Sequence, residues 1–279
     1  PATVAPGKLL ATYVDGLAGP ITLTIEDASL IIRSGNDELR LRTYPTEDWP
    51  ATRTEDGDPV DLSAEVLAAF GRITFAASRD ESRPILTGIS VRDGWAAATD
   101  SYRLAAHQLP DGLGTAILPA RAITAILKQT KTCRLTVDDI RATFATDDTT
   151  WTTRLIAGEY PNWQNLKPTP THNVVVDRTS LLHAVERVAV LSDGNRPLRL
   201  SGEGDVIRLR IQSDDGVVEC TVPADCDFEG HLGVNPAYLK ELLEALTIDC
   251  VTLGITDTNK PIIVETDGFL TLLMPVRIS

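Results

Sequence analysis

The chain has 279 residues, of which 43% are hydrophobic, and it carries a net charge of −13. This length predicts about two domains, and no run of about 18 apolar residues is present to span a membrane. The acidic balance argues against nucleic-acid binding through overall charge, because phosphate contacts need clustered lysine and arginine. The N-terminus resembles no signal peptide, and Cys133, Cys220, Cys226 and Cys250 are too few for a disulfide scaffold, so we expect a reduced, cytoplasmic protein.

One pattern, a helix followed by about three short strands, occurs three times along the chain. The first copy has a helix from Pro6 and strands at 21–25, 30–33 and 39–42. The second has a helix from Pro119 and strands at 133–137, 140–144 and 151–156. The third has a helix from Pro236 and strands at 251–255, 261–264 and 269–273. Proline at each helix start and an aromatic-Pro or Met-Pro end indicate a true repeat.

A second kind of unit alternates with the first. One copy has a helix over 62–78 and strands at 85–91 and 95–98; the other has a helix from about 180 and strands at 198–200, 206–211 and 217–222. The resulting order predicts paired units, with one further unit of the second kind, about 60 residues long, expected before the first copy. Convergence of ordinary helix-plus-meander units is the alternative.

Charge is distributed unevenly between the predicted helices and turns. The helices lean basic, whereas the acidic doublets at 138–139, 147–148 and 214–215 lie in predicted turns. This pattern favours a helix-bearing side that faces a polyanion, with acidic turns in solvent. The alternative is that lysine and arginine are simply good helix formers on solvated faces.

No catalytic constellation is apparent in the sequence. The histidines His107, His172, His183 and His231 are scattered, and the spacing of Cys220, Cys226 and His231 matches no usual zinc pattern. Asp100 and the acidic doublets could supply carboxylates to a metal-dependent nuclease, but aspartate is also expected at turn tips for backbone reasons. We therefore expect no enzyme activity, no cofactor and no metal.

Four segments resemble motifs of the bacterial DNA polymerase III beta subunit, the sliding clamp. They are 98–105 (ATDSYRLA), 155–163 (LIAGEYPNW), 235–243 (NPAYLKELL) and 272–278 (LLMPVRI), which occur in the family's order. The resemblance implies an α+β fold of repeated helix-plus-meander units, with inner helices and outer antiparallel sheets. It further implies a partial first domain at 1–50, a middle domain at 51–168 and a third domain at 169–279.

The family implies a non-catalytic processivity factor, a homodimeric ring around double-stranded DNA. Short linear peptides of the polymerase alpha subunit, the clamp loader and repair proteins would bind a surface pocket. Carried over by motif, the pocket comprises Leu86, Thr99, Ser101, Tyr102, Arg103, Leu104, Pro161, Leu166, Asn235, Tyr238, Leu272, Leu273, Met274, Pro275, Val276 and Arg277. Asn165 stands where many relatives carry arginine, so peptide preference is expected to differ.

The same resemblance implies two further surfaces. The DNA-facing residues are expected to be Arg72, Arg79, Arg83, Arg121, Lys128 and Arg187, and the head-to-tail contact between protomers is expected to join Leu39 and Leu41 to Val190 and Leu191. Without the further unit, ring closure is in question. A clamp-like module that captures peptides without encircling DNA is therefore the alternative.

Overall fold

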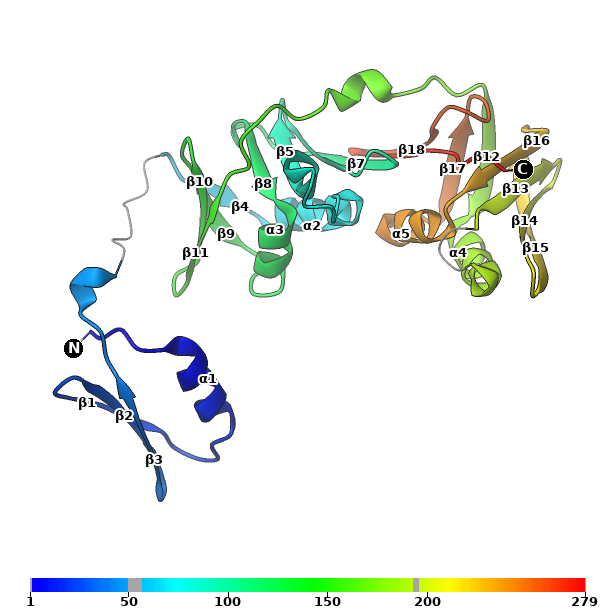
Figure 1. The fold of residues 1–279 in the computed structure, drawn as a ribbon. Helices are drawn as coiled ribbons and strands as arrows, with labels where there is room; N and C mark the ends of the chain where they lie inside the picture. The colour runs from blue at the N-terminus through cyan, green and yellow to red at the C-terminus, as the bar shows by residue number, and fades with distance from the viewer. Residues whose placement is uncertain (1, 50–56, 193–195, 279) are drawn as a thin grey trace. The chain divides into compact units, whose positions relative to one another are not determined.

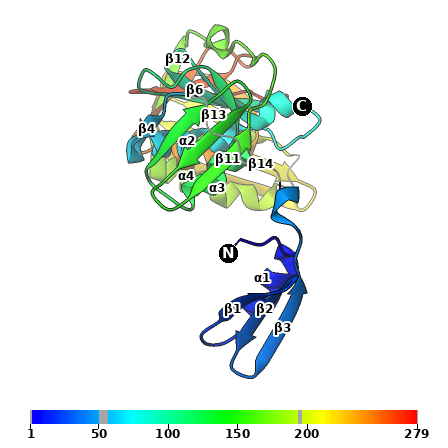
Figure 2. The same cartoon turned by 90° about the vertical axis from the view of Figure 1, so that its left-hand side faces the viewer.

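The computed structural model describes residues 2–49, 57–192 and 196–278. Contacts between residues divide them into two compact units, one before residue 55 and one from residue 55 onward. The first unit contains helix α1 (Gly7–Asp15) and the antiparallel strands β1 (Thr22–Glu26), β2 (Ser29–Ser34) and β3 (Asp37–Arg42). Figure 2 shows α1 against this sheet, with Leu30, Ile32 and Leu41 in the core between them.

The second unit contains four amphipathic helices that cover its sheets from one side (Figure 1). Their apolar residues recur at helical spacing, as with Leu181, Val185 and Val188, all fully buried. None of the helices in the described residues is long and apolar enough to cross a membrane. The helices are α2 (Ala64–Ile73), α3 (Ala120–Leu127), α4 (Arg178–Val188) and α5 (Pro236–Ala245).

Two antiparallel sheets lie behind these helices. The smaller has the order β11-β10-β9-β4 and the larger, of 12 strands, the order β16-β13-β14-β15-β12-β17-β18-β19-β7-β6-β5-β8. The strands of the smaller sheet are β4 (Val60–Leu62), β9 (Cys133–Val137), β10 (Arg141–Ala145) and β11 (Thr150–Arg154). Those of the larger sheet are β5 (Gly88–Arg92), β6 (Trp95–Thr99), β7 (Arg103–Gln108), β8 (Ala116–Pro119), β12 (His172–Asp177), β13 (Leu198–Glu203), β14 (Val206–Ser213), β15 (Gly216–Cys226), β16 (Gly230–Val234), β17 (Cys250–Ile255), β18 (Ile262–Thr266) and β19 (Phe269–Leu273).

The larger sheet joins the middle of the chain to its C-terminal part. Strand β19 pairs with β7 over five positions, from Phe269 opposite His107 to Leu273 opposite Arg103. By contrast, strands β17 and β18 are paired at a single position, Gly254 opposite Ile263. Because the hydrogen bonds of a ladder fix register and spacing, β7 and β19 hold residues from distant parts of the sequence at fixed places.

The α+β fold class that the family resemblance implies is confirmed, and all five predicted helices are present. The strand predicted over 85–91 is wrong at its start, because Pro84–Thr87 forms a 3-10 helix and the strand begins at Gly88. The tight approach of Ile117 to Gly88, where a Cβ would lie 2.4 Å from its Cγ2, explains why the strand needs glycine there. The structure adds β4, β7, β8, β12 and β16, which the sequence did not predict.

Candidate functional site

The segment 99–104 forms a tight turn between β6 and β7. The Asp100 carboxylate accepts hydrogen bonds from the backbone N–H groups of Tyr102 and Arg103, both at 2.9 Å. Ser101, the first central residue of this turn, has φ of 80°, in the region where glycine is favoured. The Asp100 carboxylate therefore fixes the backbone of the turn, and the Tyr102 side chain is exposed to solvent.

Tyr160 anchors this turn to the rest of the sheet. Its buried hydroxyl accepts a hydrogen bond from the Thr99 N–H at 3.0 Å and donates to the Gly88 carbonyl at 3.4 Å. Burial raises the pKa of Tyr160 well above its usual range, so the hydroxyl stays neutral and keeps its donor. The Thr99 hydroxyl closes the turn by donating to the Arg103 carbonyl at 2.6 Å.

An apolar surface patch lies around this turn. We define it by Tyr102 (60% exposed), Met274 (36%) and Val276 (36%), and we assign to it Leu166 (55%), which ends the 3-10 turn that begins at the buried Trp163. The N–H of Met274 donates to the Tyr102 carbonyl at 2.8 Å, and that of Val276 donates to the Gly233 carbonyl at 2.9 Å. These bonds fix the C-terminal segment beside the turn, so three patch residues are placed by main-chain contacts.

Beneath the patch lies a small hydrophobic cluster, separate from the main core. It contains Leu104, Leu272, Trp163 and Ile263, with Trp95 packed against it. Alternate residues of β7 and β19 point to opposite faces, and Ala105 and Leu273 belong to the helix-covered core. The cluster is therefore on the sheet face away from the helices, where the link between β11 and β12 crosses in Figure 1.

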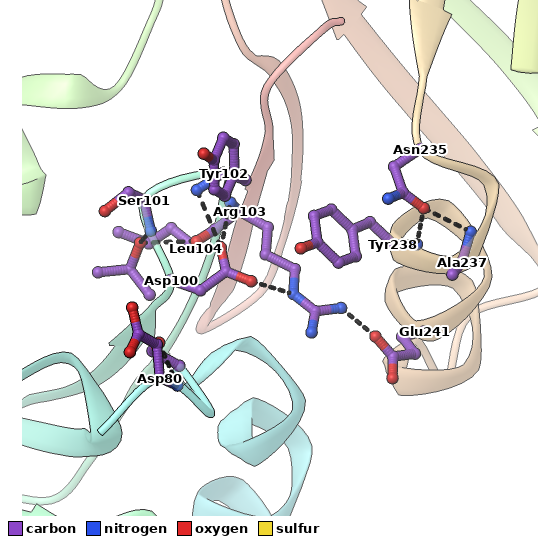
Figure 3. Close-up of polar contacts among 12 residues, drawn as sticks. Asp80, Asp100, Ser101, Tyr102, Arg103, Leu104, Asn235, Ala237, Tyr238 and Glu241 are labelled. Atoms are coloured by element: carbon purple, nitrogen blue, oxygen red, sulfur yellow. Dashed lines mark hydrogen bonds and ion pairs between the residues drawn. The ribbon is translucent and has the colours of Figure 1, made fainter. Parts of the chain in front are cut away.

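Arg103 points to the helix-covered side and is almost fully buried. Its Nε donates to the Asp100 carboxylate at 3.0 Å, and its Nη1 pairs with Glu241 on α5. The guanidinium carbon lies 4.1 Å from the ring centre of Tyr238, which Figure 3 shows beside it. A buried guanidinium requires such paired and stacked partners.

Helix α5 is positioned by its own cap and by a second arginine. The Asn235 side chain accepts from the N–H of Ala237 at 2.9 Å and of Tyr238 at 3.3 Å, which caps the helix N-terminus. At the other end, the Nε of Arg72 donates to the Ala245 carbonyl at 3.1 Å. Arg72 also stacks on Phe269 and contacts Nε2 of His107, and burial lowers the pKa of Arg72.

The residues expected in a pocket therefore fall into three groups. Tyr102, Leu166, Met274 and Val276 form the patch, with exposed Ser101, Pro161 and Arg277. Leu104 and Leu272 lie beneath it, and Leu86 and Thr99 are buried in the segments that shape the turn. Arg103, Leu273, Asn235 and Tyr238 instead form or adjoin the contact with α5, and Pro275 is half-buried between patch residues.

The cations expected to face DNA differ in their environments. Arg79, Arg83, Arg121, Lys128 and Arg187 are exposed, and no ion pair joins them to a carboxylate among residues 2–49, 57–192 and 196–278. Arg79 and Arg121 line a groove of about 950 Å³ between the segment 74–87 that follows α2, helix α3 and strand β11. Arg72 is half-buried, and its guanidinium contacts the Ala245 carbonyl and the Phe269 ring, so it is not among the exposed cations.

The residues expected at a protomer contact are also placed unequally. Val190 is 81% exposed and Leu191 is half-buried beside it at the end of α4. Leu41 is 7% exposed and packs with Leu39 against α1 in the core of the first unit. In the described part of the chain, β3 pairs only with β2, so its other edge is open.

The sequence did not single out three residues that complete the site. Glu241 pairs with Arg103, Trp163 belongs to the hydrophobic cluster, and Phe269 stacks against Arg72. Glu241 is 138 residues from Arg103, and neither residue belongs to a local pattern that signals the other. Within the described residues, no group of three or more His, Cys, Asp or Glu side chains could hold a metal ion.

Comparison with known proteins gives consistent results over the whole chain. The family model for the DNA polymerase III beta subunit central domain matches residues 62–162, and that for its C-terminal domain matches 166–277. The beta sliding clamp of Synechococcus elongatus is 31% identical over 99% of this chain and 82% of that protein. The beta sliding clamp of Streptomyces coelicolor is 28% identical over 98% of this chain and 81% of that protein.

Solved structures show the same likeness. The sliding clamp of Bartonella birtlesii bound to griselimycin has a TM-score of 0.90 and 25% identity, covering 99% of this chain and 82% of that one. The beta subunit from Thermotoga maritima has a TM-score of 0.85 and 24% identity, with the same coverage.

Proposed function

The chain belongs to the DNA polymerase III beta subunit family, the bacterial sliding clamps, and we propose that it tethers a polymerase to the duplex DNA that it encircles. Members of this family are non-catalytic accessory subunits. Processivity in such a protein comes from enclosure, so an acidic chain with weak DNA affinity can perform it. The alternative is a clamp-like module that only captures peptides. Such a module would not be retained on circular DNA, whereas a ring that encircles the duplex would be.

The observation that supports partner binding is the apolar patch at Tyr102, Leu166, Met274 and Val276. Exposed apolar groups gathered over a rigid cluster are typical of an interaction site. Met274 adds a flexible side chain that adapts to different apolar partners. We propose that this patch binds a short linear peptide through its hydrophobic side chains, with the backbone of the 99–104 turn as one wall.

Calorimetry with a peptide that ends in a Leu-Phe clamp-binding motif tests this assignment. We expect micromolar affinity, about −8 kcal/mol, and a loss of more than tenfold when Met274 and Leu104 are both replaced by alanine. Val217→Ala, which removes an exposed apolar side chain from β15, is the matched control and should bind normally. Unchanged binding by the double variant would place the peptide elsewhere.

For DNA, we propose that the helix-bearing side faces the duplex through Arg79, Arg83, Arg121, Lys128 and Arg187. These exposed cations come from α3, α4 and the segments that follow α2 and α3, and Figure 1 shows these helices along one side of the sheets. Contacts of this kind are independent of sequence and sensitive to salt. Arg121→Ala should lower the salt dependence of DNA binding by about one unit of slope.

For ring formation, we propose that β3 of one protomer meets the end of β15 and α4 of another. A pairing within the chain itself supports this proposal. Strand β19 is the third strand of its helix-plus-meander unit, and it pairs with β7, the third strand of a unit of the other kind. Strand β3 is the third strand of the first helix-plus-meander copy, as β19 is of the third copy. Its free edge could therefore pair with β15 of another protomer as β19 pairs with β7. Val190 and Leu191 would extend the contact beyond the main-chain ladder.

Sedimentation over a concentration series, with retention on circular plasmid, tests the ring. Val190→Asp should weaken self-association, whereas Val175→Asp, at an exposed position of β12, should not. Loss of retained protein when the plasmid is cut would indicate topological binding. A chain that stays monomeric yet binds the peptide would favour the module that does not encircle DNA.

A further inference from the structure

Two arginines from the middle of the chain contact helix α5. Arg103 pairs with Glu241, and Arg72 donates to the Ala245 carbonyl. Glu241 and Ala245 are four residues apart, so the two contacts are about one turn from each other, the second at the C-terminal carbonyl of the helix. The helix is thereby attached to the middle part of the chain at two successive turns.

The Arg103 contact is built from buried charge. The side chain of Arg103 is 7% exposed and that of Asp100 is 11%, whereas Glu241 remains 32% exposed. Phe75 and Tyr238 flank the guanidinium, with ring centres at 5.3 and 4.1 Å from its central carbon. Removal of Arg103 would leave the buried Asp100 carboxylate without a compensating charge, which is costly in a buried site.

The same carboxylate links this ion pair to the apolar patch. One oxygen of Asp100 accepts from Arg103 Nε, and the other accepts from the N–H groups of Tyr102 and Arg103. The Tyr102 carbonyl in turn accepts from the Met274 N–H. Figure 3 shows the guanidinium between Asp100 and Glu241, with the turn on one side and α5 on the other. A shift of α5 or of Arg103 is therefore passed to Tyr102 and Met274 by short, directional contacts.

We propose that Arg103 is a positioning residue for partner binding, whose ion pairs with Asp100 and Glu241 fix the spacing of Tyr102 and Met274. Its side chain acts through these two residues and not by touching the peptide. This inference rests on the proposed peptide-binding function of the patch. It makes the affinity of the patch depend on Glu241, a residue of helix α5 that lines one cavity with Tyr102 and Arg103.

The test uses the full chain with Glu241→Gln, Arg103→Lys and Arg103→Met. Peptide affinity is measured by calorimetry, and hydrogen exchange of the Met274 amide is measured without peptide. We expect Arg103→Met to weaken binding about tenfold and to speed Met274 exchange about tenfold, because the guanidinium fork is lost. Arg103→Lys should recover part of both effects, and Glu241→Gln should weaken binding by about threefold.

Arg208→Met is the matched control, because Arg208 also pairs with two carboxylates, Glu203 and Glu219, but lies on β14. It should leave both the affinity and the Met274 exchange unchanged. If Arg103→Met is too unstable to measure, Glu241→Gln at the more exposed partner carries the test alone.

The possible outcomes separate this inference from the proposed function. Weaker binding by Arg103→Met with normal Met274 exchange, and normal binding by Glu241→Gln, would mean that Arg103 touches the peptide directly and would overturn the inference. Absence of peptide binding by the unaltered chain would instead refute the proposed function. In that case the Met274 exchange still tests the structural link.

Discussion

Leu104 and Leu272 lie directly opposite each other in the ladder that joins β7 to β19, although they are far apart in the chain. Both are nearly inaccessible and belong to the cluster beneath the apolar patch. The floor of the proposed binding surface is thus also a contact between the two halves of the second unit. Substitutions at the floor and at the surface should therefore have different effects.

Leu104→Ala should destabilise the fold, whereas Met274→Ala should weaken peptide binding with little loss of stability. Leu104 is 2% exposed, and a buried Leu→Ala change costs about 2–5 kcal/mol. Met274 is 36% exposed, so its truncation removes less buried surface than that of Leu104. Urea unfolding and calorimetry on both single variants measure the two effects, and equal stability losses would contradict the placement of Met274 at the surface.

Tyr160→Phe should destabilise the protein by about 1–3 kcal/mol, because the buried Thr99 N–H loses its hydrogen-bond acceptor. The effect should be seen in urea unfolding at neutral pH. Tyr44→Phe is the matched control: it removes the hydroxyl of an exposed tyrosine in the first unit and should be nearly neutral. Similar losses in the two variants would mean that the Tyr160 hydroxyl contributes nothing through its burial.

Tyr160 also predicts a loss of stability in alkali. Burial raises the pKa of Tyr160 in the folded state above the unfolded value. The neutral hydroxyl is thus favoured by folding; its contribution is complete below the unfolded pKa of about 10 and is lost as pH rises beyond it. Unfolding free energies at about pH 9 and about pH 11 should diverge more for the unaltered chain than for Tyr160→Phe.

Ser101→Gly should stabilise the turn. Ser101 has φ of 80°, and a non-glycine residue in the left-handed region costs about 1–2 kcal/mol. The gain is reduced by the greater freedom of glycine in the unfolded chain, so we expect a net stabilisation of about 0.5–1 kcal/mol. Thermal unfolding of Ser101→Gly and of Ser101→Val, which should be destabilised, gives the sign of the effect.

Asn235→Ala should lower stability by about 1 kcal/mol through loss of the α5 cap. Asn235→Asp, which retains the acceptor, should be close to neutral. Chemical unfolding of both variants checks this, and a large loss in Asn235→Asp would mean that the side chain is needed for more than capping.

The helices and most strands were predictable because their signals are local. Proline at the start of α5 and apolar spacing along α4 are readable in short windows. Strand β7 was missed because Ala105-Ala106 gives little strand signal, and β16 because glycine occupies two of its five positions. At Ile85 the apolar run predicted a strand, but Pro84 starts a helical turn and only Gly88 permits the close approach of Ile117.

The residues of the candidate site were predictable only through motifs, and the contacts by which its supporting residues pair were not predictable. Tyr102 and Met274 stand in recognisable segments. The pairing of Arg103 with Glu241 depends on how β7, β19 and α5 meet in three dimensions, and buried ion pairs leave no periodic trace in sequence. The same holds for Arg72, which was expected to face DNA and whose contacts with Ala245 and Phe269 leave no local pattern in the sequence.

The uneven pairing of strands in the larger sheet has a mechanical consequence. Five ladder positions join β7 to β19, whereas one joins β17 to β18. Fewer paired positions leave fewer main-chain hydrogen bonds to resist bending, so we expect a force that bends the sheet to deform the β17–β18 seam before it separates β7 from β19. Elastic compliance would then reside inside the C-terminal part of the chain, and the seam beneath Tyr102 and Met274 would keep its shape under tension.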